Sequence, residues 1–173
     1  MDKLQEFLPS GEKGYLPYYL FVVSVVAMGN AVQNYATLHY TRRIYNGLFV
    51  TNHSLPPATD RFNPEDSTNI IKPASSTGKD AEKAKDQVSP LAARLFGMYT
   101  FAAGIIRFYA CYQLENPSLY QLAMWTHIIA SVHFTSELLV FKTIKFNGPQ
   151  ALPFLAGYSG AIWMYLQYNH YVQ

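Results

Sequence analysis

Residues 91–141 read LAARLFGMYTFAAGIIRFYACYQLENPSLYQLAMWTHIIASVHFTSELLVF and contain two long apolar runs with one short polar break between them. The break includes Asn-Pro-Ser at residues 116–118, and an Asn-Pro pair favours a turn. A helix needs about 20 apolar residues to cross a bilayer core of about 30 Å, and both runs reach that length. The stretch therefore predicts an antiparallel hairpin of two transmembrane helices, over residues 91–113 and 119–141.

Two further apolar runs, residues 16–37 and 152–168, flank this hairpin in the sequence. The first reaches the length of a membrane span, and the second is near the lower limit. A soluble bundle of helices needs a charged outer face, which these runs lack, so a soluble all-α protein is the weaker alternative. We predict an all-α polytopic membrane protein whose four transmembrane helices form one compact bundle, a single domain over residues 1–173.

The segment between the first two runs, residues 51–88, has a different composition, with several prolines, many Ser, Thr and Asn, and a mixed-charge stretch. Such a segment buries little apolar surface, so we expect a polar loop without regular structure, with a short helix at its end. Lysine and arginine near helix ends mark the cytosolic side of a membrane protein. They gather in the first and third loops, at Arg42, Arg43, Lys85, Lys142 and Lys145. We therefore expect these loops in the cytosol and both termini in the lumen.

The composition excludes several classes of protein. The single cysteine, Cys111, leaves no internal disulfide and no cysteine-based zinc site. The net charge is +2 and no dense basic cluster is present, so nucleic acid is not an expected partner. The sequence shows no phosphate-binding loop, nucleotide fingerprint or Ser/His/Asp set, and we predict neither a cofactor nor a catalytic residue.

Three ionisable residues of the third run, His127, His133 and Glu137, raise the question of a metal or acid/base site. His133 and Glu137 are four residues apart and share a helix face. At about 100° per residue, His127 lies about 120° round the helix from His133. A catalytic zinc needs three protein ligands, and only His133 and Glu137 share a face of this helix. We therefore predict no metal site. A small membrane enzyme built on His133 and Glu137 is a competing hypothesis.

Ionised side chains inside a membrane usually pair and face the bundle interior. In an antiparallel hairpin, residues at equal distances from the turn lie at the same depth, which sets Arg94 level with Glu137 and Arg107 level with Trp125 and His127. We predict an Arg94–Glu137 pair near the cytosolic end. We also predict that Arg107 meets His127 or stacks on Trp125 near the lumenal end. The alternative for Arg94 is that its side chain extends to the cytosolic headgroups.

The first run carries a polar stripe at helical spacing, formed by Asn30, Gln33, Asn34 and Thr37. Hydrogen bonding between helices is the expected role of such a stripe. The alternative is a site for the polar headgroup of a ligand.

Small residues predict two seams for close helix packing. One seam follows the second run through Ala93, Gly97 and Gly104, on the face that also carries Thr100, Arg107 and Cys111. The other follows the fourth run through Gly157, Gly160 and Ala161. One seam would hold the bundle together, which leaves the other for a dimer or for a protein partner.

Several stretches together resemble the ergosterol biosynthetic protein twenty-eight family, and the match spans all four predicted helices. The most specific blocks are Ala-Arg-x-Phe-Gly at residues 93–97 and His-Phe-x-Ser-Glu at residues 133–137. Further matching stretches are VVAMGNAVQ (25–33), IIRFYACY (105–112), NPSLYQLAMWT (116–126) and IWMY (162–165). The resemblance leaves residues 51–88 uncovered, and Tyr99 stands where the family usually has tryptophan.

The resemblance implies a four-helix protein of the endoplasmic reticulum membrane without catalysis of its own. Such proteins act as scaffolds for the enzymes of sterol C-4 demethylation, and they are expected to form homodimers. The implied partners are the sterol C-4 methyl oxidase, the decarboxylating sterol-4-carboxylate 3-dehydrogenase and the 3-keto sterol reductase. The sterol C-24 methyltransferase is often counted as a fourth partner. The main alternative is a protein that binds or hands over membrane sterols through the polar stripe of the first helix.

Overall fold

The computed structural model describes residues 7–52, 71–74, 78 and 81–172 of the chain. Four long helices make up most of it: α2 (Leu16–Ala36), α4 (Pro90–Tyr112), α5 (Pro117–Leu139) and α6 (Gly148–Tyr171). The shorter elements are α3 (His39–Ile44), β1 (Phe49–Thr51), β2 (Ile71–Pro73) and the 3₁₀ turn η2 (Ala81–Lys83).

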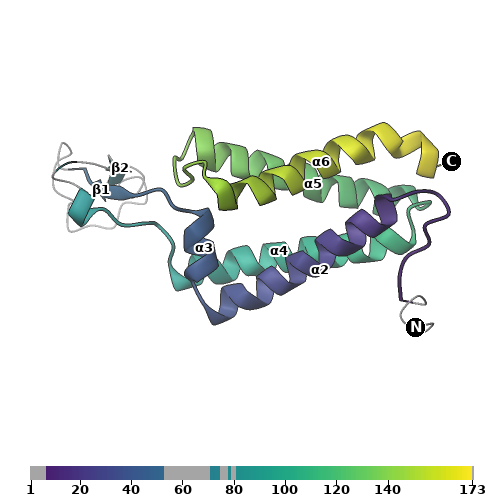
Figure 1. Cartoon of the computed structure of the whole chain (residues 1–173), viewed down its shortest axis with the longest axis horizontal. Coiled ribbons are helices and arrows are strands. Elements are labelled where there is room, and N and C mark those ends of the chain that lie inside the picture. Colours follow the sequence, from purple (N-terminus) through teal and green to yellow (C-terminus); the bar gives the residue numbers. More distant parts are fainter. Residues whose placement is uncertain (1–6, 53–70, 75–77, 79–80, 173) are drawn as a thin grey trace, which may run out of the picture.

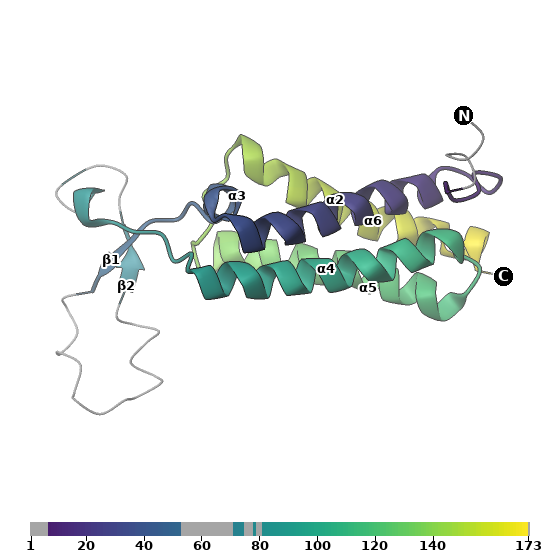
Figure 2. The same cartoon turned by 90° about the horizontal axis from the view of Figure 1, so that it is seen from below.

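The long helices form two pairs that lie side by side, α2 with α4 and α5 with α6 (Figure 1, Figure 2). Although α4 and α5 are joined by a short turn, α4 packs chiefly against α2 and only lightly against α5. Both chain termini lie at one end of the bundle, and the short strands project from the other end (Figure 1). We call these the terminal end and the loop end.

The helix termini follow from local sequence chemistry. The Ser89 hydroxyl accepts a hydrogen bond from the Ala92 amide at 3.1 Å, and Pro90 is the first residue of α4. The Asn116 side chain accepts bonds from two amides at the start of α5, which closes the predicted hairpin. The fourth helix differs from the prediction: it begins at Gly148, so Pro153 lies inside it rather than at its start.

The segment between the first two long helices is not wholly without regular structure. Strand β1 pairs with β2 in an antiparallel register that sets Phe49 opposite Pro73, and η2 supplies the short helical turn expected near the end of the segment. The fold is therefore mostly helical with one small sheet. Residues 53–70, 75–77 and 79–80 of this predicted loop lie outside the described residues.

All four long helices point large apolar side chains outward. Examples are Val22, Val26 and Val32 of α2, Leu91, Leu95 and Met98 of α4, Leu122, Ile129 and Val132 of α5, and Leu152, Leu155 and Ile162 of α6. Within the described residues, α2 and α4 are the two helices long and apolar enough to cross a membrane by length and composition. Helices α5 and α6 have 23 and 24 residues, but more of their residues are polar.

The interior of the bundle changes character along its axis. At the terminal end, an apolar cluster gathers Leu16, Leu20, Tyr120 and Met164, all with 0% exposure. Near the middle, buried polar side chains replace it, and at the loop end a cavity opens between the two helix pairs. The polar middle and the cavity contain the residues of functional interest.

Candidate functional site

The small residues of α4 form the contact with α2. A Cβ added to Gly97 would lie 3.1 Å from Asn34 Cβ and 3.3 Å from the Ala31 carbonyl oxygen. A Cβ on Gly104 would lie 3.1 Å from Met28 Cγ. Ala93, the third member of this seam, is fully buried. The seam predicted on the second run thus serves packing within the chain.

The small residues of α6 form the contact with α5. A Cβ on Gly160 would lie 2.3 Å from His127 Nδ1, and one on Gly157 would lie 2.8 Å from Ser131 Oγ. Ala161 is half-buried at the edge of this contact. Because both glycine seams are covered by helices of the same chain, the expectation that one of them stays free for a partner is wrong.

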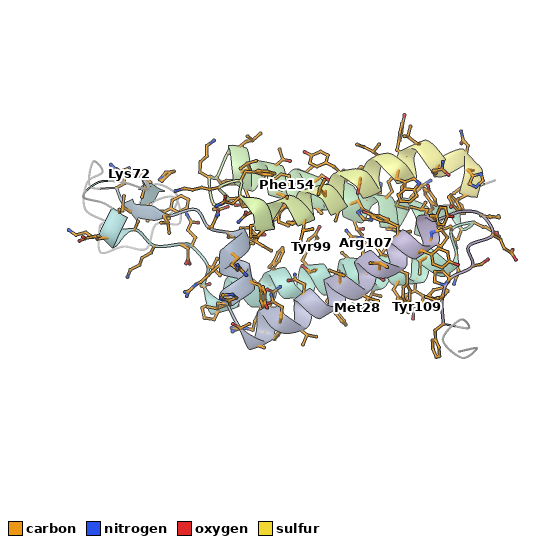
Figure 3. The ribbon with its side chains drawn as sticks, in the orientation of Figure 1. Met28, Lys72, Tyr99, Arg107, Tyr109 and Phe154 are labelled. Carbon is orange, nitrogen blue, oxygen red and sulfur yellow. The ribbon has the colours of Figure 1, made fainter. Side chains whose placement is uncertain are left out.

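Arg107 lies buried between the two helix pairs, and its Nε donates a hydrogen bond to the Thr126 hydroxyl at 2.8 Å (Figure 3). The prediction placed Arg107 level with Trp125 and His127, and Thr126 lies between these two in sequence. The depth was therefore right, but the hydrogen-bond partner is the residue between the two candidates. The Trp125 side chain, at 55% exposure, points outward.

His127 ties α5 to α6. Its Nδ1 lies 3.0 Å from the Ala156 carbonyl oxygen, and its ring stacks on Tyr19 of α2 at 5.8 Å. The Tyr19 hydroxyl donates to the same Ala156 carbonyl at 2.7 Å. Three helices therefore meet at one backbone oxygen, and the His127 ring is enclosed by them.

The polar stripe of α2 bonds within its own segment. Gln33 donates to the side-chain oxygens of Asn30 and Asn34, at 3.2 Å and 3.1 Å, and the Thr41 hydroxyl of α3 donates to Asn34 at 2.6 Å. Asn34 is buried against the Gly97 seam. These bonds hold the turn from α2 into α3 and not a contact between long helices.

Arg94 and Glu137 do not form the predicted pair. Among the described residues, Glu137 accepts a hydrogen bond from Thr143 and lies near His133, whereas the Arg94 side chain is exposed and has no ion pair. The reason is the rotation of α4. Turning Ala93 and Gly97 toward α2 points Arg94 away from α5.

A polar cluster of Tyr45, His133, Glu137 and Thr143 stands at the loop end. The Tyr45 hydroxyl lies 2.6 Å from His133 Nε2, and His133 Nδ1 lies 3.9 Å from Glu137 Oε1. Burial raises the pKa of the Tyr45 hydroxyl, and the Glu137 charge adds to this rise, so Tyr45 remains protonated at neutral pH. Sequence reasoning missed Tyr45 and Thr143 because both lie outside the apolar runs.

The cluster borders a cavity of about 490 Å³ at the loop end. The lining combines the four residues of the cluster with the apolar side chains Val88, Ala92, Phe96 and Ile129 and with Thr41, Gln87 and Tyr99, which carry further polar groups. Figure 3 shows Tyr99 between the two helix pairs. Asn30, Gln33 and Asn34 are not among the lining residues, so the polar stripe of α2 and this cavity are separate features.

Over the described part of the chain, no three His, Cys, Asp or Glu side chains are grouped as metal ligands would be.

These observations define a small helical-bundle protein that buries several polar side chains and points many large apolar side chains outward. Residues 16–162 match the family described as Erg28 like protein, and the chain belongs to this family. The resemblance seen in the sequence is thereby confirmed.

Two fungal relatives match over nearly their whole length. The chain is 49% identical over 173 residues to the ergosterol biosynthetic protein 28 of Gibberella zeae. The matched residues make up 100% of this chain and 99% of that protein. It is 34% identical over 168 residues to the protein of the same name from Candida albicans, covering 97% and 96%. With the Saccharomyces cerevisiae protein the identity is 29% over 160 residues, covering 92% and 84%. No solved structure matches the chain.

Proposed function

We propose that this chain is a non-catalytic membrane scaffold of sterol biosynthesis. It spans the endoplasmic reticulum membrane with four helices and holds the enzymes of sterol C-4 demethylation next to one another. The proposed partners are the C-4 methyl oxidase, the decarboxylating 3-dehydrogenase and the 3-keto reductase, with the C-24 methyltransferase as a fourth. Tethering raises the effective concentration of successive enzymes for intermediates that dissolve poorly in water.

The observation that carries this proposal is the combination of outward-facing apolar side chains and buried polar side chains in a chain of this family. Arg107, His127 and Asn34 are buried inside the bundle, while valines and leucines of all four long helices point outward. A soluble bundle places polar side chains on the outside. The reverse pattern suits a bilayer, where polar groups pair inside the protein and apolar groups face lipid.

The chemistry of the interior favours a structural role over catalysis. The Arg107 Nε is occupied by Thr126, and His127 Nδ1 is occupied by the Ala156 carbonyl. These bonds connect neighbouring helices, as polar groups do in membrane bundles. Arg107 and His127 therefore hold neighbouring helices together.

The arrangement of the chain ends fits the proposed topology. Both termini lie at one end of the bundle, and the basic residues Arg42, Lys142 and Lys145 belong to segments at the other end (Figure 1). The positive-inside rule then assigns the loop end to the cytosol and the terminal end to the lumen.

Partners must reach the outward faces of the helices because both glycine seams are covered internally. The outer face of α2 presents Val25, Gly29 and Val32, and a Cβ on Gly29 would meet nothing within 4 Å. Small and β-branched residues give a smooth surface for another transmembrane helix. We propose this face as a contact for an enzyme partner, with self-association through the remaining outward faces.

The test is affinity purification of the tagged full chain from native membranes in mild detergent, followed by identification of the proteins that accompany it. We expect the sterol C-4 demethylation enzymes to be recovered. Recovery of none of them would overturn the scaffold proposal.

Variants sharpen this test. Gly29→Leu is expected to lower the recovery of at least one enzyme while the melting temperature of the purified chain is unchanged. Gly148→Leu is the matched control, since a Cβ there also meets nothing within 4 Å and the residue lies at the start of α6. Equal recovery with both variants would exclude the outer face of α2 as the contact.

A further inference from the structure

The cavity at the loop end has the size and lining of a site for a small apolar ligand. Its volume of about 490 Å³ falls within the roughly 300–1,000 Å³ that is usual for such sites. Most of the lining surface is apolar. Four of the lining residues that carry polar groups form the cluster of Tyr45, His133, Glu137 and Thr143, and the other three are Thr41, Gln87 and Tyr99. This combination is typical of sites that bind an apolar body and recognise one polar group.

Among the described residues, no direct hydrogen bond joins His133 Nδ1 to Glu137 Oε1. His133 Nδ1 and Glu137 Oε1 are 3.9 Å apart, which is too far for a hydrogen bond between them. The other acceptor positions are occupied, because Tyr45 bonds to Nε2 and Thr143 bonds to Oε2. The His133 and Glu137 side chains are 34% and 19% exposed, so both are accessible from the cavity.

The chemistry of these two atoms specifies what fits between them. When the protonated Tyr45 hydroxyl donates to Nε2, the proton of the neutral His133 ring is on Nδ1, which makes Nδ1 a donor. The Glu137 carboxylate oxygen only accepts. An oxygen that accepts from Nδ1–H and donates to Oε1 would bridge the gap, as a water or an alcohol does.

Other oxygen-bearing groups fit less well. A ketone or an ether accepts but does not donate, so it leaves Oε1 unbonded. A carboxylate would be repelled by Glu137, and among the described residues that line the cavity no lysine or arginine compensates. The site therefore discriminates in favour of a neutral alcohol.

The position of the cluster suits an alcohol that enters from the bilayer. His133 and Glu137 lie in the last two turns of α5, which ends at Leu139, so in a spanning bundle they stand close to headgroup depth. The apolar part of the cavity, with Phe96 and Ile129, extends from them between α4 and α5. An amphipathic molecule would be held with its hydroxyl near the headgroups and its apolar body in the hydrocarbon region.

We propose that this cavity binds a neutral sterol alcohol, whose hydroxyl oxygen bridges His133 Nδ1 and Glu137 Oε1. The choice of an alcohol rests on the geometry, and the choice of a sterol rests on the proposed function in sterol biosynthesis. On this proposal the scaffold itself holds a sterol in its alcohol form, at a site separate from the polar stripe of α2.

The test is a competition assay with the purified full chain in nanodiscs and tritium-labelled ergosterol as the probe. Unlabelled ergosterol is compared with its 3-methyl ether, its 3-ketone and its 3-sulfate. A hydrogen bond to a charged acceptor corresponds to about tenfold in affinity, so the ether and the ketone should compete about tenfold more weakly. The sulfate should not compete.

Variants test the acceptor directly. Glu137→Gln keeps the shape of the side chain and removes its charge, and it should weaken ergosterol binding by about tenfold. Glu115→Gln, at the terminal end of the bundle and far from the cavity, should bind like the unchanged chain. If Glu137→Gln does not fold, the competition series on the unchanged chain still decides the proposal.

Three outcomes would overturn the inference: no saturable binding of ergosterol, equal competition by the alcohol and its methyl ether, or displacement of the probe by phospholipid alone. The same preparation separates this inference from the scaffold proposal. Enzymes recovered without sterol binding would leave the scaffold intact and remove the cavity's role. Sterol binding without any recovered enzyme would support the cavity and remove the scaffold.

Discussion

The two helix pairs of this bundle pack by different means. In the α2–α4 pair, Gly97 and Gly104 face backbone oxygens and side-chain carbons of α2. In the α5–α6 pair, Gly157 and Gly160 face the Ser131 hydroxyl and the His127 ring. Glycine allows close approach in both pairs, but in the first it brings a helix against backbone oxygens and side-chain carbons, and in the second it makes room for a serine hydroxyl and a histidine ring.

The two pairs also differ in hydropathy. Helices α2 and α4 are apolar enough to count as candidate spans, whereas α5 carries Thr126, His127 and Ser131 on its buried face. Those polar groups face other helices rather than the surroundings. The mean hydropathy of a helix therefore includes polar side chains that the tertiary structure keeps inside.

The largest loss of stability should come from adding a side chain at Gly160 in the α5–α6 pair. Gly160→Ala sets a Cβ 2.3 Å from a ring atom of the buried His127, and the ring is enclosed by Tyr19 and Ala156. Such overpacking should lower the free energy of unfolding by about 2–3 kcal/mol. Thermal unfolding in detergent measures it, with Gly29→Ala as the control because nothing lies within 4 Å of that position. A stable Gly160→Ala protein would show that His127 has room to move.

The next effect concerns the bond that connects the two pairs. Thr126→Val keeps the side-chain shape and leaves the buried Arg107 Nε without its acceptor, which should cost about 1–3 kcal/mol. Thr100→Val is the matched control, since the Thr100 hydroxyl bonds only to the Phe96 carbonyl of its own helix. Equal melting temperatures for the two variants would contradict a structural role for the Arg107–Thr126 bond.

Adding a side chain at Gly97 in the α2–α4 pair should change the stability less. In Gly97→Ala the new methyl group meets Asn34 Cβ at 3.1 Å, a contact that a small shift relieves. The gain in helix propensity, about 1 kcal/mol, offsets much of the strain. We expect a change in unfolding free energy below about 1 kcal/mol, so the ratio of the Gly160 and Gly97 effects measures the contrast between the pairs. A Gly97→Ala loss as large as that of Gly160→Ala would remove the contrast.

The smallest effect lies outside both pairs, at the terminal end. The Lys13 ammonium, 2.6 Å from Glu115, lowers the pKa of that carboxyl below its ordinary value. A lowered folded-state pKa contributes stability above the unfolded pKa of about 4.3, and this stability is lost as pH falls through the folded pKa. Lys13→Gln should raise the pKa of Glu115 toward its ordinary value, as measured by NMR titration. An unchanged pKa would show that the ion pair does not form in solution.

Local sequence signals predicted much of the fold because they act over short distances. Ser89, Pro90 and Asn116 satisfy or avoid backbone donors at helix starts, and these bonds need no distant partner. Counting from the hairpin turn also gave the right depth for Arg107, since helical rise is fixed. The site was harder to predict, because Tyr45 and Thr143 reach His133 and Glu137 from segments outside the apolar runs.

The sequence by itself determined the four long helices, their order and the turn between α4 and α5, because apolar run length and capping chemistry are local properties. Only the tertiary structure decided that α4 turns its small-residue face to α2, which points Arg94 outward and leaves Glu137 to Thr143 and His133. The rotation of a helix about its axis depends on which partner buries it best. That choice is a property of the assembled bundle, because it is the fit between two surfaces that fixes it.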